Sequence, residues 1–269
     1  MDVLSYARYL ARRAVRGSYG SMVGREFQAP DWDIYRMDVK RPFEAIEHPE
    51  REIRMVDSAL HALQQAGIIG DTRYDHAGYA AMREAVKREF DIPWTAISPR
   101  VQRLIYAINA IHRPAVMIAA GVFCGNTFIS NAGAAVGPGA GYAARALIGI
   151  EIDPEEAQRA ERNVRRIDRT QVARIVADDA VEFCATWSDR IDLLYLDADG
   201  DRGRGKSIYR EILDTAWDKL PAGALMLAHN SVNSATAMRD YLEFVRNPAN
   251  CGASINLVLD WEGLEVSRK

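Results

Sequence analysis

The stretch that decides the fold is "VMIAAGVFCGNTFIS", residues 116–130. An apolar run of strand-forming residues ends at Gly121, Gly125 follows four positions later, and after Asn126 and Thr127 the pattern becomes helical. This order predicts a turn whose backbone lies close to a ligand, because glycine has no side chain to block the approach and adopts positive φ without strain. The alternative is a plain tight turn between a strand and a helix.

Beyond residue 98 the sequence alternates between short apolar runs and amphipathic segments. The apolar runs, which we expect to be strands, are residues 115–121, 146–152, 173–178, 191–199, 224–230, 254–261 and 264–269. We expect helices at residues 100–111, after the glycine turn, and at 154–167, 179–187, 207–220 and 234–247. This alternation predicts a mostly parallel sheet with helices on both faces. Such sheets bind ligands beyond the carboxyl ends of their strands, so we expect the functional side chains directly after the strands.

The first 95 residues are predicted to be helices and loops. Residues 3–17 place apolar and basic side chains at helical spacing, which predicts a basic amphipathic helix that packs on its own protein in preference to a membrane surface. The segment from Arg25 to Pro49 lacks periodicity and is expected to be an ordered loop, and helices follow near residues 50–67 and 76–90.

Composition excludes several classes of protein. A chain of 269 residues with 48% hydrophobic and 26% charged residues is globular, and its formal net charge of -3 gives no reason to expect nucleic acid. Cys124, Cys184 and Cys251 are widely spaced, which argues against a disulfide framework or a zinc site and favours the cytoplasm. We find neither an apolar run of the roughly 20 residues that span a bilayer nor a signal peptide. The expected partner is a small molecule, with no nucleic acid and no membrane.

Several ordered motifs resemble the class I S-adenosylmethionine-dependent methyltransferases, and within them the small-molecule O-methyltransferases of the catechol and caffeoyl-coenzyme-A type. The stretches that carry the resemblance are "ISPRVQRLIYAI", "VMIAAGVFCGNTF", "LIGIEIDPEEAQRAERNV", "IVADDAVEF", "IDLLYLDAD", "LPAGALMLAHN" and "INLVLDWEGLEVSRK". The resemblance covers residues 96–269, the expected S-adenosylmethionine-binding core. It implies a Rossmann-like, seven-stranded, mostly parallel sheet with an antiparallel last strand. Residues 1–95 would precede this core as a helical cap that serves as a lid or an oligomerisation region.

The resemblance also implies where S-adenosylmethionine binds. The residues assigned to the cofactor are Ala119, Gly121, Gly125, Asn126, Thr127, Glu151, Ile152, Asp179, Ala180 and Asp197. Glu151 ends the second strand and offers two acceptor oxygens to the vicinal ribose hydroxyls. Asp179 and the backbone of Ala180 are assigned to adenine, but Asp178 or Asp179 can instead cap the helix that follows.

Ala119 and Gly200 are two of the positions that depart from the family pattern. Ala119 stands where the family has an acidic residue near the ammonium group of the cofactor, and Asp197 is the candidate that compensates. Gly200 stands where the family has a lysine, and residues 200–205 are rich in glycine, which predicts a flexible loop that closes over the substrate.

A histidine after the fifth strand has more than one interpretation. The catechol-type enzymes hold a divalent cation with an Asp after strand four and an Asp-Asn pair after strand five, where this chain has Asp197 and then His229 and Asn230. Because imidazole suits zinc, copper, iron or nickel, these three residues can form a site with an altered metal preference. Alternatively, His229 is the general base of a metal-free enzyme, with Asp197 as the second catalytic residue. A structural histidine is the third interpretation.

The implied reaction is transfer of a methyl group from S-adenosylmethionine to a small-molecule acceptor, at a hydroxyl, by in-line displacement. Alternatives are methylation of carbon or nitrogen, transfer of another alkyl group, or a cofactor-binding protein without catalysis. A nicotinamide-dependent dehydrogenase is a further alternative, but "GVFCGNTF" lacks its GxGxxG fingerprint. The N-terminal helices are expected to cover the active site or to form a homodimer interface.

Overall fold

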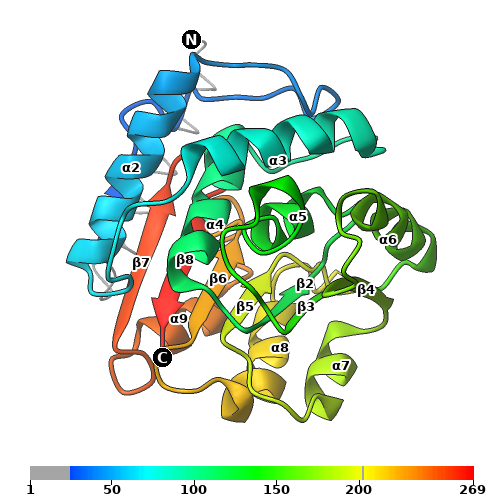
Figure 1. The fold of residues 1–269 in the computed structure, drawn as a ribbon. Helices are drawn as coiled ribbons and strands as arrows, with labels where there is room; N and C mark the ends of the chain where they lie inside the picture. The colour runs from blue at the N-terminus through cyan, green and yellow to red at the C-terminus, as the bar shows by residue number, and fades with distance from the viewer. Residues whose placement is uncertain (1–24, 202) are drawn as a thin grey trace.

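The computed structural model describes residues 25–201 and 203–269, which form a central sheet between two helical layers (Figure 1). The strands are β1 (Arg25–Gln28), β2 (Val116–Ala120), β3 (Ala146–Glu151), β4 (Ala173–Ala177), β5 (Leu193–Leu196), β6 (Leu225–His229), β7 (Ala253–Val258) and β8 (Leu264–Arg268). The α-helices are α2 (Pro49–Gln65), α3 (His76–Glu89), α4 (Pro99–His112), α5 (Asn126–Ala132), α6 (Pro154–Ile167), α7 (Ala180–Thr186), α8 (Ile208–Ala216) and α9 (Arg239–Arg246). Two short 3-10 helices are η1 (Gly137–Gly139) and η2 (Trp217–Lys219). The helix predicted at residues 3–17 lies outside the described residues.

The order of strands in the sheet is β1-β7-β8-β6-β5-β2-β3-β4. Every neighbouring pair is parallel except that β8 runs antiparallel to both β6 and β7. The prediction of a Rossmann-like, mostly parallel sheet with an antiparallel last strand is therefore confirmed. From β2 the chain builds β3 and β4 on one side and then β5 and β6 on the other, so the direction of winding reverses between β2 and β5. That reversal opens a crevice at the carboxyl ends of the two central strands.

An additional strand extends the predicted sheet at its edge. All seven predicted strands form, and β1 adds an eighth by pairing parallel with β7 in the register Arg25↔Ile255. The loop predicted from Arg25 to Pro49 is thus wrong over its first four residues. Strand β1 is short and mostly exposed, so it carries no alternating hydrophobic pattern, and its hydrogen-bonding partner lies near the other end of the chain.

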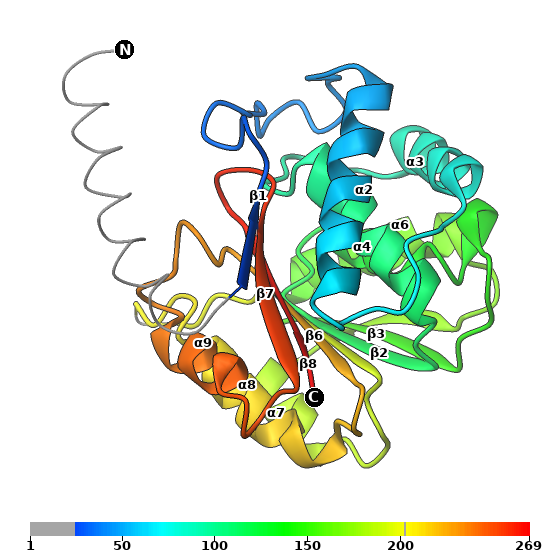
Figure 2. The same ribbon diagram turned by 90° about the vertical axis from the view of Figure 1, so that its left-hand side faces the viewer.

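Alternate residues of the central strands face opposite helical layers, as the period of two in a strand requires. Met117 and Ala119 of β2 belong to the core shared with helices α2 to α6, whereas Ile118 and Ala120 belong to the core shared with α7, α8 and α9. Figure 2 shows these two layers on either side of the sheet. Both faces of the sheet are therefore buried by helices.

Local sequence signals explain where the helices begin. Helix α6 follows Asp153, whose carboxylate accepts hydrogen bonds from the backbone nitrogens of Glu155 at 2.8 Å and Glu156 at 3.3 Å. Pro154 occupies the first turn, where its missing N–H costs nothing. Acidic residues in the first turn and arginines in the last turn complement the helix dipole. The helix is thus positioned directly after Glu151, the residue that ends β3.

A buried cluster of ion pairs connects the N-terminal part of the described chain to the core. Arg100 of α4 is fully buried and donates to Glu47 at 2.7 and 2.6 Å and to Asp31 at 2.9 and 3.0 Å. Helix α2 also packs against α4 in the shared core. The role of residues 1–95 as a lid or an oligomerisation region stays a prediction. Over the described ranges 25–201 and 203–269, no helix has the length and apolar character needed to cross a bilayer.

Candidate functional site

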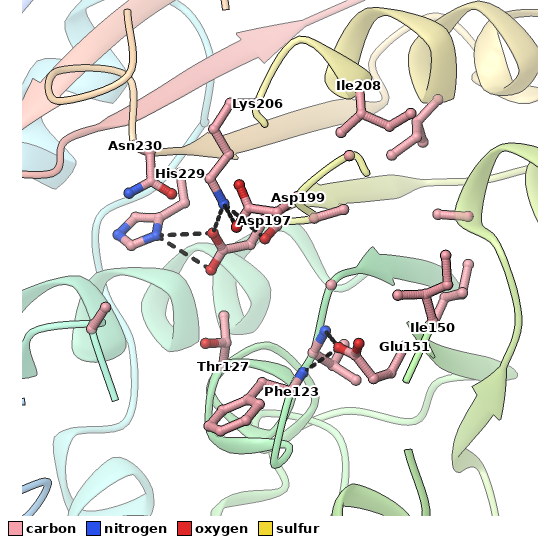
Figure 3. Close-up of a pocket in the computed structure, with 18 of the residues that line it drawn as sticks. Phe123, Thr127, Ile150, Glu151, Asp197, Asp199, Lys206, Ile208, His229 and Asn230 are labelled. Carbon is pink, nitrogen blue, oxygen red and sulfur yellow. Dashed lines mark hydrogen bonds and ion pairs between the residues drawn. The ribbon is translucent and has the colours of Figure 1, made fainter. Parts of the chain in front are cut away.

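A cavity of about 490 Å³ lies at the carboxyl edge of the sheet (Figure 3). It is lined by ten of the predicted site residues: Gly121, Asn126, Thr127, Glu151, Ile152, Asp179, Ala180, Asp197, His229 and Asn230. The other two, Ala119 and Gly125, do not line it. Ala119 is buried within β2, and Gly125 precedes α5. The tertiary structure therefore brings together the residues that follow β2, β3, β4, β5 and β6.

The glycine turn after β2 packs tightly against the end of β5. Gly121 has φ +79°, and a Cβ atom at this position would lie 2.5 Å from the Cα of Ala198. Gly125 has φ +89°, and Phe123 between them also has positive φ, at 47°. The ring of Phe123 contacts that of Trp94, with centroids 4.6 Å apart. Glycine is thus required at position 121 both by the backbone conformation and by the neighbouring strand.

Glu151, at the end of β3, accepts hydrogen bonds from the backbone of this turn. Its Oε2 atom accepts hydrogen bonds from the backbone nitrogens of Phe123 at 2.7 Å and Val122 at 3.1 Å, and its Oε1 atom accepts one from Asp153 at 3.2 Å. A carboxylate oxygen has two lone pairs, so Oε2 is fully used by these hydrogen bonds, whereas one lone pair of Oε1 remains for a ligand in the cavity. Next to it, Ile152 presents an apolar side chain that is 63% exposed at the cavity wall.

The residue that caps α7 is Asp179, one of the two candidates. Its Oδ1 accepts from the backbone nitrogens of Val181 at 2.7 Å and Glu182 at 3.3 Å. Asp178 instead accepts from the backbone nitrogen of Asp179 at 2.8 Å. Capping occupies only one oxygen of Asp179, so the other oxygen is free of that role in the cavity wall.

Asp197 lies at the centre of a charged cluster where β5 and β6 end. Lys206 Nζ lies 3.0 Å from Asp197 Oδ1, and His229 Nδ1 lies 3.3 Å from the same carboxylate (Figure 3). Burial would raise the pKa of Asp197, but Lys206 and His229 outweigh it and lower that pKa. Burial likewise opposes the charge on Lys206, yet Asp197 and Asp199 raise the pKa of its ammonium group. The three side chains hold one another in their charged forms.

His229 has one ring nitrogen engaged and the other unsatisfied. The side chain is almost fully buried, and Nε2 has no hydrogen-bond partner among the described residues. The nearest carboxylate to Nε2 is that of Glu262, at 3.5 Å. Burial alone would lower the pKa of His229, but Asp197, with Glu262 and Asp260, overcomes this and raises it to about 9. The imidazole is therefore a stronger base than an ordinary histidine and is mostly protonated at neutral pH.

Lys206 and Glu262, the charged residues nearest to Asp197 and His229 in the cavity wall, were not predicted as site residues from the sequence. Lys206 comes from the glycine-rich loop after β5, and Glu262 comes from the turn between β7 and β8. Glu262 Oε2 accepts a hydrogen bond from Asn230 Nδ2 at 2.8 Å, and burial raises the pKa of its carboxyl group. Glu262 falls between the last two predicted strands, 254–261 and 264–269, but nothing local indicates that it folds back onto the end of β6.

The three residues predicted as metal ligands come together, but the carboxylate of Asp197 and the Nδ1 atom of His229 are already engaged. Asp197 is shared by Lys206 and His229, and the amide nitrogen of Asn230 donates to Glu262. Within residues 25–201 and 203–269, no group of three or more His, Cys, Asp or Glu side chains is arranged to hold a metal ion.

Comparison with known proteins relates this arrangement to characterised folds. Residues 118–231 match a family described as a methyltransferase domain. A cofactor-bound protein from MTB, Rv0187, is similar over 72% of this chain and 90% of its own, with TM-score 0.56 and 19% identity. An O-methyltransferase from Bacillus cereus in complex with SAH gives TM-score 0.55 and 12% identity over 81% of this chain and 100% of its own. The O-methyltransferase TomG from Streptomyces achromogenes, in complex with SAM, gives TM-score 0.52 and 18% identity over 83% of this chain and 99% of its own. No curated protein sequence matches the chain.

Proposed function

We propose that this chain, in which residues 118–231 match a methyltransferase domain, is an S-adenosylmethionine-dependent methyltransferase that methylates a hydroxyl group of a small-molecule acceptor. The observation that carries the proposal is the pair of Asp197 and His229 in the cavity wall, with Nδ1 of the imidazole held by the carboxylate and Nε2 unsatisfied. In such a pair the carboxylate orients the ring, and Nε2 is left to receive a proton. The similarity to O-methyltransferases from Bacillus cereus and Streptomyces achromogenes supports a hydroxyl as the acceptor group.

We assign the cofactor to the half of the cavity between the glycine turn and the ends of β3 and β4. S-adenosylmethionine supplies a methyl group that its sulfonium already activates, so the protein's tasks are to bind, to align and to remove a proton. Glu151 holds the ribose hydroxyls, and Ile152 covers the adenine. The remaining contacts are assigned to Asn126, Thr127, Asp179 and Ala180.

His229 is the proposed general base. In its neutral form, Nε2 accepts the proton of the acceptor hydroxyl while the oxygen of that hydroxyl attacks the methyl carbon and the bond from this carbon to sulfur breaks. The imidazolium that results lies between two carboxylates, Asp197 at 3.3 Å from Nδ1 and Glu262 at 3.5 Å from Nε2. Asp197 is therefore assigned to His229, and its predicted contact with the ammonium group of the cofactor becomes secondary.

The charge of the cavity favours a neutral or cationic acceptor. Carboxylates outnumber cations in its wall, with Glu151, Asp178, Asp179, Asp197, Asp199, Asp201 and Glu262 facing Arg204, Lys206 and His229. A phosphate-bearing acceptor would require more lysine and arginine side chains than this wall offers. We therefore propose a small acceptor without phosphate groups.

The proposal is tested in two steps with the full chain. Calorimetric titration should detect binding of S-adenosylhomocysteine and no binding of NAD. Equal binding of NAD would favour a dehydrogenase instead. A panel of phenols, alcohols, amines and carbon acids is then incubated with methyl-labelled S-adenosylmethionine. Label on oxygen is the expected result, label only on nitrogen or carbon overturns the hydroxyl assignment, and binding without turnover across the panel indicates a non-catalytic protein.

The remaining proposals concern assembly and compartment. We propose that the N-terminal region forms a homodimer interface or a lid, which sedimentation of the full chain against a variant lacking residues 1–24 would test.

We also propose a cytoplasmic location, since Cys124, Cys184 and Cys251 are all buried free thiols.

A further inference from the structure

Lys206 reaches the candidate site because the loop before it folds back on itself. Gly200 and Gly205 pair as an antiparallel bridge, with the nitrogen of Gly200 donating to the oxygen of Gly205 at 2.9 Å and the reverse bond at 3.2 Å. This bridge closes the loop and returns the chain to the end of β5. The sequence lacks a lysine directly after Asp199, and the folded loop supplies one from a later position.

The ammonium group of Lys206 is held by contacts on one side of the site. Its Nζ atom lies 3.0 Å from the backbone oxygen of Asp197, 3.0 Å from Asp197 Oδ1 and 3.2 Å from Asp199 Oδ2. These three partners match the three N–H donors of an ammonium group. Lys206 is only 8% exposed, so its charge acts on Asp197 with little screening by water. A positive charge is therefore a fixed part of this site.

The residues present do not fit the divalent cation that catechol-type enzymes hold at this place. A metal ion bound to Asp197 would have to displace Lys206 and His229 Nδ1, or lie beside the ammonium group and be repelled by it. The amide nitrogen of Asn230 donates to Glu262, so this side chain offers a cation only one neutral oxygen, Oδ1. Asp199 is exposed and already pairs with Lys206, so no oxygen-rich set of ligands remains.

We propose that Lys206 takes the place of that divalent cation: its ammonium group neutralises Asp197 and holds it against His229, so the protein works without a metal ion. Lys206 is a positioning residue, because it acts on the reaction through Asp197. The role of Lys206 in turnover rests on the proposed methyl transfer. The inference that a lysine occupies the position of a metal ion does not depend on that proposal. Cation binding therefore tests the inference even where no acceptor is methylated.

The test is a gain of metal binding on removal of the charge. Mn²⁺ alone is titrated into the full chain and followed by its electron paramagnetic resonance signal. We expect Lys206→Met, which keeps the length of the side chain, to bind Mn²⁺ at the site at least about tenfold more tightly than wild type does. Adding Asp197→Asn to Lys206→Met should abolish the new site. Lys87→Met removes an exposed lysine from α3 and should behave as wild type.

Three outcomes overturn the inference. If wild type binds Mn²⁺ and the Asp197→Asn variant does not, the protein has a metal site despite the presence of Lys206. Lys206→Met that melts as wild type but gains no Mn²⁺ shows that lysine does not occupy a metal position. If Lys206→Met does not fold, Lys206→Ala takes its place in the titration. With an acceptor found in the panel, the inference is also overturned if a chelator abolishes wild-type turnover and any divalent cation restores it. If no acceptor in the panel is methylated, that result contradicts only the proposed function.

Discussion

The carboxylate of Glu151 and the backbone nitrogen of Phe123 lie 2.7 Å apart, which joins the end of β3 to the glycine turn after β2. The same oxygen accepts a second hydrogen bond from Val122 at 3.1 Å. One acidic residue thus stabilises a turn that contains a positive φ at Phe123 and also faces the cavity. Cofactor binding and the shape of the turn should depend on it together.

Glu151→Ala should weaken binding of S-adenosylmethionine by more than about tenfold, because a lost charge-assisted hydrogen bond costs about 1.5 to 3 kcal/mol. Isothermal titration measures the affinity. Glu155→Ala, an exposed acidic residue in the first turn of α6, is the matched control and should bind normally. Unchanged affinity in a folded Glu151→Ala protein would remove this residue from the ribose site.

Gly121→Val should abolish cofactor binding while the protein still melts cooperatively. A side chain at Gly121 would meet the Cα of Ala198 at 2.5 Å, and valine does not tolerate φ +79°. The turn must therefore shift away from the end of β5. Gly70→Val is the control, since a Cβ atom there meets nothing within 4 Å and its φ is not positive. Normal cofactor affinity in Gly121→Val would contradict the assignment of the turn.

Methyl transfer should speed up as the pH rises through about 9, the value to which the carboxylates around His229 raise its pKa. The sign follows from the role of a base: only the neutral imidazole accepts a proton, and at pH 7 about one molecule in a hundred has it. The measurement is turnover from pH 6 to 10 with saturating substrates. His229→Ala should be slow and lack this rise, and a rise that persists in the variant would assign the titration to another group.

The same shift predicts how the stability provided by His229 depends on pH. A pKa raised in the folded state stabilises the protein fully below the unfolded value of 6.5, and this contribution is lost as the pH rises through about 9. The free energy of unfolding of wild type should therefore exceed that of His229→Asn by more at pH 6 than at pH 10, as measured by urea titration. An equal difference at both values would show that the imidazole titrates normally.

Arg100→Ala should destabilise the protein by about 3 to 5 kcal/mol, because it leaves two buried or partly buried carboxylates without their cation. Arg100 is fully buried and donates to both Glu47 and Asp31. Urea unfolding gives the free energy, and Arg54→Ala, at an exposed position of α2, should change it by less than about 0.5 kcal/mol. A small loss in Arg100→Ala would mean that solvent reaches the two carboxylates.

Seven of the eight strands of the described sheet, the helices and ten of the residues that line the cavity could be predicted because their signals are local. Apolar runs bounded by amphipathic helices indicated the parallel sheet, and the residue after each strand lies at the carboxyl edge whatever the packing of the helices. Glu151 and His229 were therefore identified as candidates from their positions at the ends of strands together with the resemblance to the methyltransferase motifs. Their roles in binding and catalysis still depend on the experiments above.

Contacts between distant segments were decided only by the tertiary structure. Strand β1 could not be recognised because four mostly exposed residues become a strand only beside β7. Lys206 and Glu262 were missed because a folded loop and a hairpin turn bring them to Asp197 and His229. Hydrophobic periodicity records which face of an element is buried, and it carries no information on which distant charge lies opposite. The sequence by itself therefore determined seven strands of the sheet and the edge at which we propose that ligands bind, whereas long-range packing determined the charges that meet there.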